Sequence, residues 1–254
     1  MSKDFASKRA AFRALHESGH FVIPNPWDIG SARRLEKLGF KALASTSAGY
    51  AWTLGRKDGE LSLDEVLEHL RALCAATDLP INADFEAGFA DQPDGVAANV
   101  RLAVETGVAG LSIEDRTGRD LYPVSLAVER IRAGREAIDK SGQDVLLIGR
   151  TEGLLIGKTS LDEVIERLVA YSNAGADVLY APGIKDLAGV KGIVESVAPK
   201  PVNVLLLDMN VADLAEAGVR RISLGSALAA AAWAGFEKAV LSVRDEGRLP
   251  AAGG

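Results

Sequence analysis

The sequence has very little cysteine, few aromatic residues and no long apolar segment. Cys74 is the single cysteine among 254 residues, which excludes intramolecular disulfides and a metal cage built from several thiolates. No apolar run approaches the roughly 20 residues that span a bilayer. The N-terminal stretch "MSKDFASKRAAFRALHESGH" lacks the apolar core of a secretory signal. These absences predict a soluble, cytoplasmic protein.

An excess of positive charge is also missing. The formal net charge is -6 and the isoelectric point is near 5.2, with no basic stripe interleaved with aromatic residues. This balance predicts that neither nucleic acid nor a membrane is a partner. Apolar residues make up 48% of the chain and charged residues 25%, as is typical of a globular protein. No linker divides the sequence, so we expect one domain over residues 1–254.

A helical pattern leads through a glycine into a short apolar segment at four places, marked by Gly39, Gly107, Gly175 and Gly218. Each glycine is predicted to end a helix just before a buried strand. Four further apolar segments are "HFVIPNPWD", "LPINADFE", "DVLLIGRTE" and "KPVNVLLLD". The chain is therefore predicted to contain eight strands that alternate with helices.

Two of the predicted helices begin with the same capping box, "SLDEV" at 62–66 and at 160–164. The strands are almost continuously apolar, which indicates burial on both faces and a parallel sheet. Eight strand–loop–helix units within 254 residues favour a (β/α)8 barrel over a doubly wound sheet.

In such a barrel, the groups that do chemistry lie at the carboxyl ends of the strands. The charged residues at the ends of the third, fourth and fifth strands are Asp84, Glu86, Glu114, Asp115, Arg116, Arg150 and Glu152. Asp84 and Glu86 are two residues apart, so strand alternation predicts that both point to one side. Clustered carboxylates suit a hard divalent ion, Mg²⁺ or Mn²⁺. For any one acid, the alternative is a helix cap or an ordinary surface ion pair.

The turn "STSAG" after the second strand offers hydroxyl groups and backbone amides that could hold a carboxylate, although a plain turn explains it equally well. Trp27 lies near the predicted mouth, where it could line the pocket, and Asn203 lies in the seventh apolar segment. The predicted substrate contacts are Ser45, Thr46, Ser47, Ala48, Trp27, Arg150 and Asn203.

Several motifs at these strand ends together resemble the isocitrate lyase and phosphoenolpyruvate mutase superfamily over nearly the whole chain. They are "NPWDIGSARRLEKLGFKALASTSAG", "LGRKDGELS", "LPINADFEAGFA", "VAGLSIEDR", "LLIGRTEG" and "NAGADVLYAPG". Each motif is weak alone, whereas the set is specific. The resemblance implies the phosphoenolpyruvate/pyruvate type of (β/α)8 barrel.

The resemblance also implies site roles. It places the metal ligands at Asp84, at Glu86 where a second aspartate is usual, and at Glu114. It assigns catalytic roles to Asp58 in "LGRKDG", to Glu114 and to Arg150, which would also bind substrate. The substrate carboxylate would be held by the turn over residues 45–48. The implied cofactor is Mg²⁺ or Mn²⁺.

Two departures from the superfamily pattern bear on the reaction. The lyases carry a cysteine and a histidine in the loop after the fourth strand, where this chain reads "EDRTGRDLYP". The phosphonate enzymes carry a histidine after the sixth strand, where this chain has Ala181. The remaining resemblance is to the branch that includes oxaloacetate-decarboxylase-like proteins.

The sequence therefore predicts a Mg²⁺-dependent carbon–carbon lyase that acts on a small 2-oxo or 2-hydroxy dicarboxylate through an enolate, for example by decarboxylating oxaloacetate. Arg116 or Arg119 could pair with a distal carboxylate. The alternatives are a phosphonopyruvate hydrolase or phosphonomutase that cleaves a phosphorus–carbon bond, and a 2-oxo-acid-binding protein without turnover. By resemblance, the partner is a second copy of the chain, in a homodimer or homotetramer with or without helix exchange.

Overall fold

Eight parallel strands form the centre of the protein, of which a computed structural model describes residues 4–250. They are β1 (Phe21–Ile23), β2 (Leu43–Ala44), β3 (Ile81–Asp84), β4 (Gly110–Glu114), β7 (Leu146–Arg150), β8 (Val178–Tyr180), β9 (Val202–Leu205) and β10 (Arg221–Ser223). Their order is β1-β10-β9-β8-β7-β4-β3-β2. The Ala44 amide donates to the Pro24 carbonyl at 3.0 Å, which joins the two end strands. The predicted barrel and its eight strands are confirmed.

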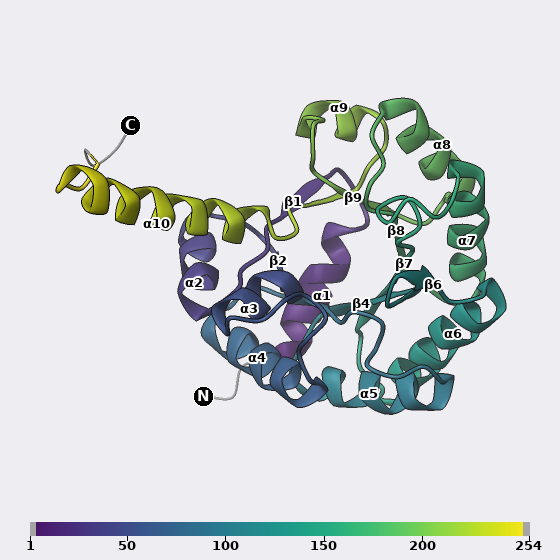
Figure 1. The fold of residues 1–254 in the computed structure, drawn as a ribbon. Helices are drawn as coiled ribbons and strands as arrows, with labels where there is room; N and C mark the ends of the chain where they lie inside the picture. The colour runs from purple at the N-terminus through teal and green to yellow at the C-terminus, as the bar shows by residue number, and fades with distance from the viewer. Residues whose placement is uncertain (1–3, 251–254) are drawn as a thin grey trace.

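Helices surround the strands on the outside (Figure 1). They are α2 (Ile29–Lys37), α3 (Ser47–Thr53), α4 (Leu63–Ala76), α5 (Pro93–Glu105), α6 (Val124–Lys140), α7 (Leu161–Asn173), α8 (Leu187–Val197) and α9 (Val211–Glu216). Both predicted capping boxes are present. Ser62 and Ser160 each accept from a glutamate amide, and Glu65 and Glu163 each accept from the serine amide in return. The main core lies between the strands and this helical layer.

The four predicted glycines do follow helices, and each has a positive φ, between 87° and 104°. At Gly107 the conformation and the packing both require glycine, because an added Cβ would lie 2.5 Å from the Phe5 ring. The sharp reversal at each glycine returns the chain directly into the next strand.

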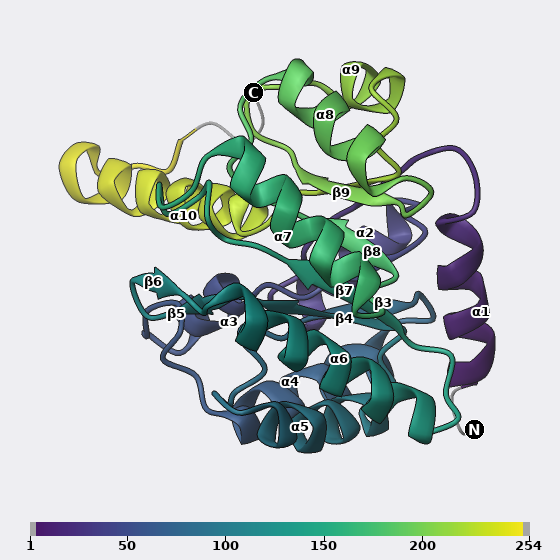
Figure 2. The same cartoon turned by 90° about the vertical axis from the view of Figure 1, so that its right-hand side faces the viewer.

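Helix α1 (Phe5–Leu15) covers the N-terminal end of the barrel, opposite α10 (Figure 2). The Phe12 side chain is fully buried and packs in a separate small core inside the barrel. That core includes Ile23, Ile148 and Val178. Because apolar side chains fill this end, a ligand can enter only from the carboxyl ends of the strands.

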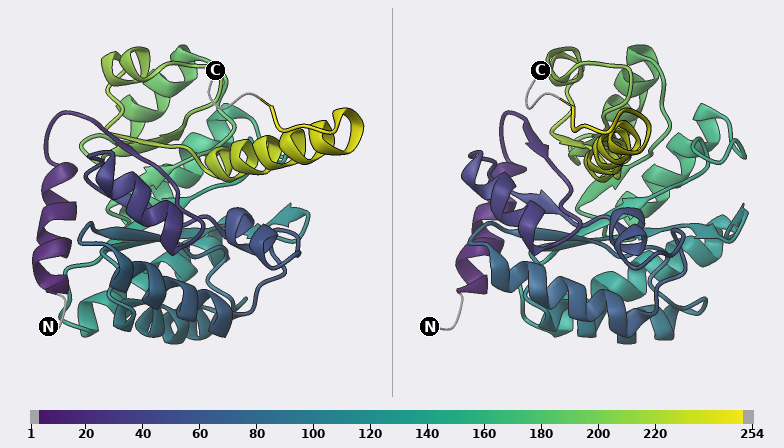
Figure 3. Two further views of the ribbon diagram at one scale, coloured as in Figure 1. Left: turned by 90° about the vertical axis from the view of Figure 1, so that its left-hand side faces the viewer. Right: turned by 60° about the vertical axis from the view of Figure 1, so that its left-hand side comes forward.

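Two segments extend the molecule at the carboxyl end of the barrel. A hairpin of β5 (Arg116–Thr117) and β6 (Asp120–Leu121) follows β4, in a stretch predicted only as a loop. Helix α10 (Ala227–Glu246) projects away from the barrel, and Ala229 is its one buried residue (Figures 1 and 3). Within residues 4–250, no helix combines the length and apolar character needed to cross a membrane.

Candidate active site

A cavity of about 170 Å³ opens among the carboxyl ends of the strands. Its lining includes the predicted residues Ser45, Thr46, Ser47, Ala48, Asp58, Asp84, Arg150 and Asn203. A second hollow of about 380 Å³ adjoins it and includes Glu86, Glu114 and Glu152. Ser47, Asp58 and Arg150 line both spaces. The structure therefore brings the predicted acids other than Asp115, the turn after β2 and the arginine at the end of β7 to one place.

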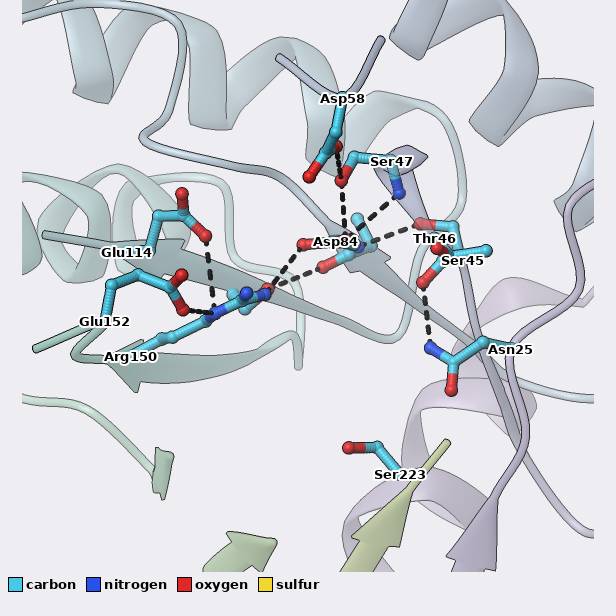
Figure 4. A network of polar contacts seen from close by, with 12 residues as sticks. Asn25, Ser45, Thr46, Ser47, Asp58, Asp84, Glu114, Arg150, Glu152 and Ser223 are labelled. Carbon is cyan, nitrogen blue, oxygen red and sulfur yellow. Dashed lines mark hydrogen bonds and ion pairs between the residues drawn. The ribbon is translucent and has the colours of Figure 1, made fainter. Parts of the chain in front are cut away.

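Asp84, the last residue of β3, is the centre of the polar network (Figure 4). Its Oδ2 accepts from the Ser47 amide at 3.0 Å, and its Oδ1 accepts from Arg150 Nη1 at 3.2 Å. Ser47 Oγ lies 3.1 Å from Asp84 Oδ2 and 2.7 Å from Asp58 Oδ1. Ser47 is predicted as a donor to the substrate. In the structure its amide donates to Asp84, and its hydroxyl lies between Asp84 and Asp58.

Arg150, the last residue of β7, contacts three carboxylates. Its Nε lies 2.6 Å from Glu152 Oε1 and 3.3 Å from Glu114 Oε2, and its Nη1 lies 3.2 Å from Asp84 Oδ1. Burial alone would lower the pKa of Arg150, but the neighbouring acidic groups, first Glu114 and Glu152, together outweigh burial and raise it. The guanidinium is therefore a permanent positive charge that stands among an excess of negative ones.

Glu86 lies beyond the end of β3, so the strand-alternation argument for Asp84 and Glu86 is wrong. Glu86 adopts a φ of 46° in the turn after the strand. Its carbonyl accepts from the Glu114 amide at 3.0 Å, which places these two residues next to each other. Burial, followed by the charges of Asp84 and Asp58, raises the pKa of Glu86 to about 8. Burial also raises the pKa of Glu114, against the effect of Arg150.

These acids suit a divalent cation that keeps most of its water ligands. Within residues 4–250, no three acidic, histidine or cysteine side chains are placed to hold an ion by themselves. However, Glu86 Oε1 is buried with no hydrogen-bond partner, and the pKa of Glu86 is raised first by burial and then by the negative charges of Asp84 and Asp58. Mg²⁺ commonly binds through one or two carboxylates plus waters, so the donor set fits it. The predicted ligands Asp84, Glu86 and Glu114 remain a prediction.

The metal-free protein should lose stability as pH rises from about 4.5 to about 8. Glu86 has an ordinary pKa of 4.5 and a folded-state pKa of about 8, so its contribution is complete below 4.5 and lost by pH 8. We expect the free energy of unfolding in urea with EDTA to fall by roughly 2 to 4 kcal/mol between pH 5 and pH 8.5. The Glu86→Gln variant should show a smaller fall. An equal fall in both proteins would contradict the assignment to Glu86.

Asp115 faces away from the cavity, although it neighbours Glu114. It is 2% exposed, and it accepts from the Glu152 amide at 2.9 Å, Tyr171 Oη at 2.6 Å and Arg167 Nη1 at 3.1 Å. Asp115 therefore holds the loop after β7 in place, through buried contacts that are neither a helix cap nor a surface ion pair. Trp27 lies against Gly49 and is absent from the described lining of both spaces, so the geometry gives its predicted substrate contact no support.

Sequence reasoning missed a set of polar residues inside the barrel that also line the cavity. They are Asn25, Asn82, Ser112, Tyr180, Arg221 and Ser223. Most of them lie within short strands that also contain apolar residues, as in "INAD", "GLSIE" and "RIS". A polar residue in a strand that is buried on both faces must contact either another polar group or a ligand. The sequence shows that polar residues occur in these strands, but it does not show that they face one cavity.

Comparison with known proteins gives a consistent result. The family model for phosphoenolpyruvate phosphomutase matches residues 12–244. An oxaloacetate decarboxylase of Pseudomonas putida (strain GB-1) is 34% identical, over 86% of this chain and 78% of its own. A Burkholderia cenocepacia J2315 structure with a suggested lyase or mutase activity is 45% identical, with a TM-score of 0.93, over 96% of this chain and 90% of its own.

A third similar protein is an oxaloacetate acetylhydrolase whose structure contains the product oxalate. It is 27% identical with a TM-score of 0.89, and the match covers 98% of this chain and 90% of that one. The region matched by the family model, residues 12–244, includes every strand of the barrel and every acid of the site. The chain therefore belongs to the phosphoenolpyruvate mutase family, within the isocitrate lyase and phosphoenolpyruvate mutase superfamily.

Proposed function

We propose that the protein is a Mg²⁺- or Mn²⁺-dependent lyase that cleaves a carbon–carbon bond in a small 2-oxo or 2-hydroxy dicarboxylate, with oxaloacetate decarboxylation as the first reaction to test. The observation that carries the proposal is the contact of Arg150 with Asp84, Glu114 and Glu152 at the barrel mouth. A cation site beside a partly buried arginine suits an anion whose negative charge moves onto its ketone oxygen during the reaction. Relatives named oxaloacetate decarboxylase support this choice.

Residues of the site would have separate roles in metal binding, substrate orientation and proton transfer. Asp84, with Glu86 and Glu114, would hold the ion, which supplies positive charge beside the developing enolate oxygen. Arg150 would orient the substrate through a charge-assisted hydrogen bond to a carboxylate oxygen. Asp58 lies at the exposed side of the cavity, 2.7 Å from Ser47 Oγ, where it could pass a proton to C3.

Decarboxylation suits this site because its first step needs no general acid. The C3–C4 bond breaks, CO2 leaves, and the electron pair passes into the enolate of pyruvate. A proton is needed only afterwards, at C3. The cysteine and histidine of the lyase loop are therefore dispensable, in keeping with the hairpin "RTGRDLYP" that stands in their place.

The test is a panel of 2-oxo and 2-hydroxy acids, each assayed by product analysis with Mg²⁺, with Mn²⁺ and with EDTA. We expect pyruvate formation from oxaloacetate above the spontaneous rate, and its loss in EDTA. Phosphate release from phosphonopyruvate, or its conversion to phosphoenolpyruvate, would instead indicate chemistry at a phosphorus–carbon bond; the matched family model is that of phosphoenolpyruvate phosphomutase. Binding of 2-oxo acids without turnover of any of them would indicate a binding protein.

We further propose that the protein is a homodimer or homotetramer assembled through α10. Trp233, Phe236, Val240 and Val243 are all exposed, by 39% to 59%, and their spacing places them along one face of the helix. Trp233 and Phe236 pack edge to face at 5.8 Å. An apolar stripe of this kind on a projecting helix is typical of a protein interface.

Replacing Trp233 and Phe236 with glutamate should convert the oligomer to a monomer, because the substitution puts two charges into the apolar stripe. Light scattering coupled to gel filtration measures the mass. Lys238→Glu is the matched control, since Lys238 lies on the opposite face of α10. An unchanged mass in the double variant would show that another surface holds the subunits together.

A further inference from the structure

A buried arginine lies deep in the barrel, away from the acids at the mouth. Arg221 is 3% exposed and lines the 170 Å³ cavity. Its Nη1 donates to Asn82 Oδ1 at 3.2 Å, and its guanidinium lies 5.9 Å from the centre of the Phe12 ring. Its Nε is buried without a hydrogen-bond partner. Among the described residues, no carboxylate forms an ion pair with it.

Arg221 and Arg150 belong to one register row of the sheet. Paired positions run from Arg221 to Asn203, then to Tyr180, Arg150 and Glu114, on five consecutive strands. Residues of one row face the same side, and four of these five line the cavity. This row therefore contains two arginines. Arg150, at the mouth of the barrel, forms ion pairs with three acids, whereas Arg221, at the floor, forms none among the described residues.

The wall beside Arg221 is polar and not fully paired. Asn203 is completely buried and donates through Nδ2 to Ser223 Oγ at 3.1 Å, while its Oδ1 has no partner. Burial lowers the pKa of Arg221 to about 10, and Tyr180 and Asp84 offset this only in part, so it remains charged at neutral pH. Burying a charge without a counterion costs folding free energy, so a charged Arg221 with no acid beside it destabilises the protein until a negative group binds there.

Since Arg221 faces a cavity, the missing negative charge can come from a ligand. We propose that Arg221 binds a second anionic group of the substrate, so that the site selects compact dianionic 2-oxo acids. This inference rests on the proposed function and extends it by assigning the end of the substrate that lies farthest from the cation site. It replaces the expectation that Arg116 or Arg119 binds the distal carboxylate. Arg116 lines the second hollow, not the 170 Å³ cavity, and donates through Nε to Gly118 O at 2.8 Å. Arg119 is exposed in the hairpin turn and is absent from the described lining of both spaces.

The experiment measures binding to the Mg²⁺-loaded full chain by calorimetry, with two probes. The dianionic probe is 3,3-difluorooxaloacetate, and pyruvate is its monoanionic counterpart. The wild type should bind the dianion at least about 10-fold more tightly, as a charge-assisted contact implies. Arg221→Gln should lower the affinity for the dianion by about 10- to 100-fold and the affinity for pyruvate by less than about threefold. Arg221→Lys should recover part of the loss.

Arg220→Gln is the matched control. Arg220 is the adjacent arginine and contacts the Gly19 carbonyl outside the barrel, so the same substitution there should leave both affinities unchanged. Arg116→Gln tests the rival position. Thermal unfolding of each variant shows whether it is folded.

Several results would overturn the inference. One is an unchanged affinity of Arg221→Gln for the dianion, and another is a loss that follows Arg116→Gln instead. If Arg221→Gln does not fold, equal binding of both probes by the wild type would overturn the inference without any variant. Binding of neither probe by the Mg²⁺-loaded wild type would overturn the proposed function and this inference together. Normal pyruvate binding with no effect of Arg221 would overturn this inference alone.

Discussion

Asp84→Asn should lower kcat/KM for the metal-dependent reaction by roughly a thousandfold, because it removes charge from the residue at the centre of the site without changing its shape. Asp84 accepts from both the Ser47 amide and Arg150, so it links the turn after β2 to the arginine at the end of β7. The asparagine amide would present a donor to Arg150, which already donates there. The measurement is the initial rate of product formation against Mg²⁺ concentration.

Asp177→Asn is the matched control for this prediction. Asp177 is also a partly buried aspartate paired with an arginine, Arg135, at 2.9 Å, but it precedes β8 at the opposite end of the barrel. Its variant should have a lower melting temperature and a nearly unchanged kcat/KM. If Asp84→Asn kept full metal-dependent turnover, the metal site and the reaction assigned to it would both be wrong.

The fold could be predicted from sequence because all eight strands are apolar segments, and four of them also follow a glycine that ends a helix. An apolar segment indicates a buried strand, and a glycine such as Gly107 or Gly175 marks the end of the preceding helix. The capping boxes at Ser62 and Ser160 then mark where helices begin. The β5–β6 hairpin escaped prediction because its two-residue strands are mostly polar and depend on each other for pairing.

The site could be predicted only as far as the strand ends. Beyond a strand end, side-chain direction depends on the turn, and the positive φ of Glu86 has no sequence signal in a residue other than glycine. Asp115 follows Glu114 directly, yet it points to Tyr171 and Arg167 in the helical layer. Sequence proximity therefore identified the right segment and could not separate the acid that faces the cavity from the acid that supports the loop.

The polar interior was missed for a different reason. In strands buried on both faces, alternation between apolar and polar residues disappears, so the inward positions cannot be recognised from periodicity. Arg221 follows another arginine in "VRRIS", and only the register with Asn203 shows which of the two enters the barrel. Knowledge of the closed sheet was needed to see that charge at the floor and charge at the mouth line the same cavity.

Arg150→Met should destabilise the protein strongly and abolish turnover. The methionine would leave Asp84, Glu114 and Glu152 close together without the cation that contacts all three. Breaking a buried ion pair from one side costs about 3 to 5 kcal/mol. The expected loss should be smallest near pH 5 and should grow toward pH 8, because protonated acids no longer repel one another. Urea unfolding at several pH values measures this dependence.

Arg150→Lys and Arg135→Met separate the role of charge from that of packing. Lysine keeps the positive charge, so Arg150→Lys should recover much of the stability at pH 8 while turnover stays low, since an ammonium group cannot reproduce the contacts of Nε and Nη1. Arg135 is partly buried and pairs with Asp177 and Asp139, so Arg135→Met removes an arginine and two ion pairs far from the site. It should cost stability to a similar extent at pH 5 and pH 8. A pH-independent loss in Arg150→Met would mean that the three acids do not share one electrostatic environment, and the case for a cation among them would fail with it.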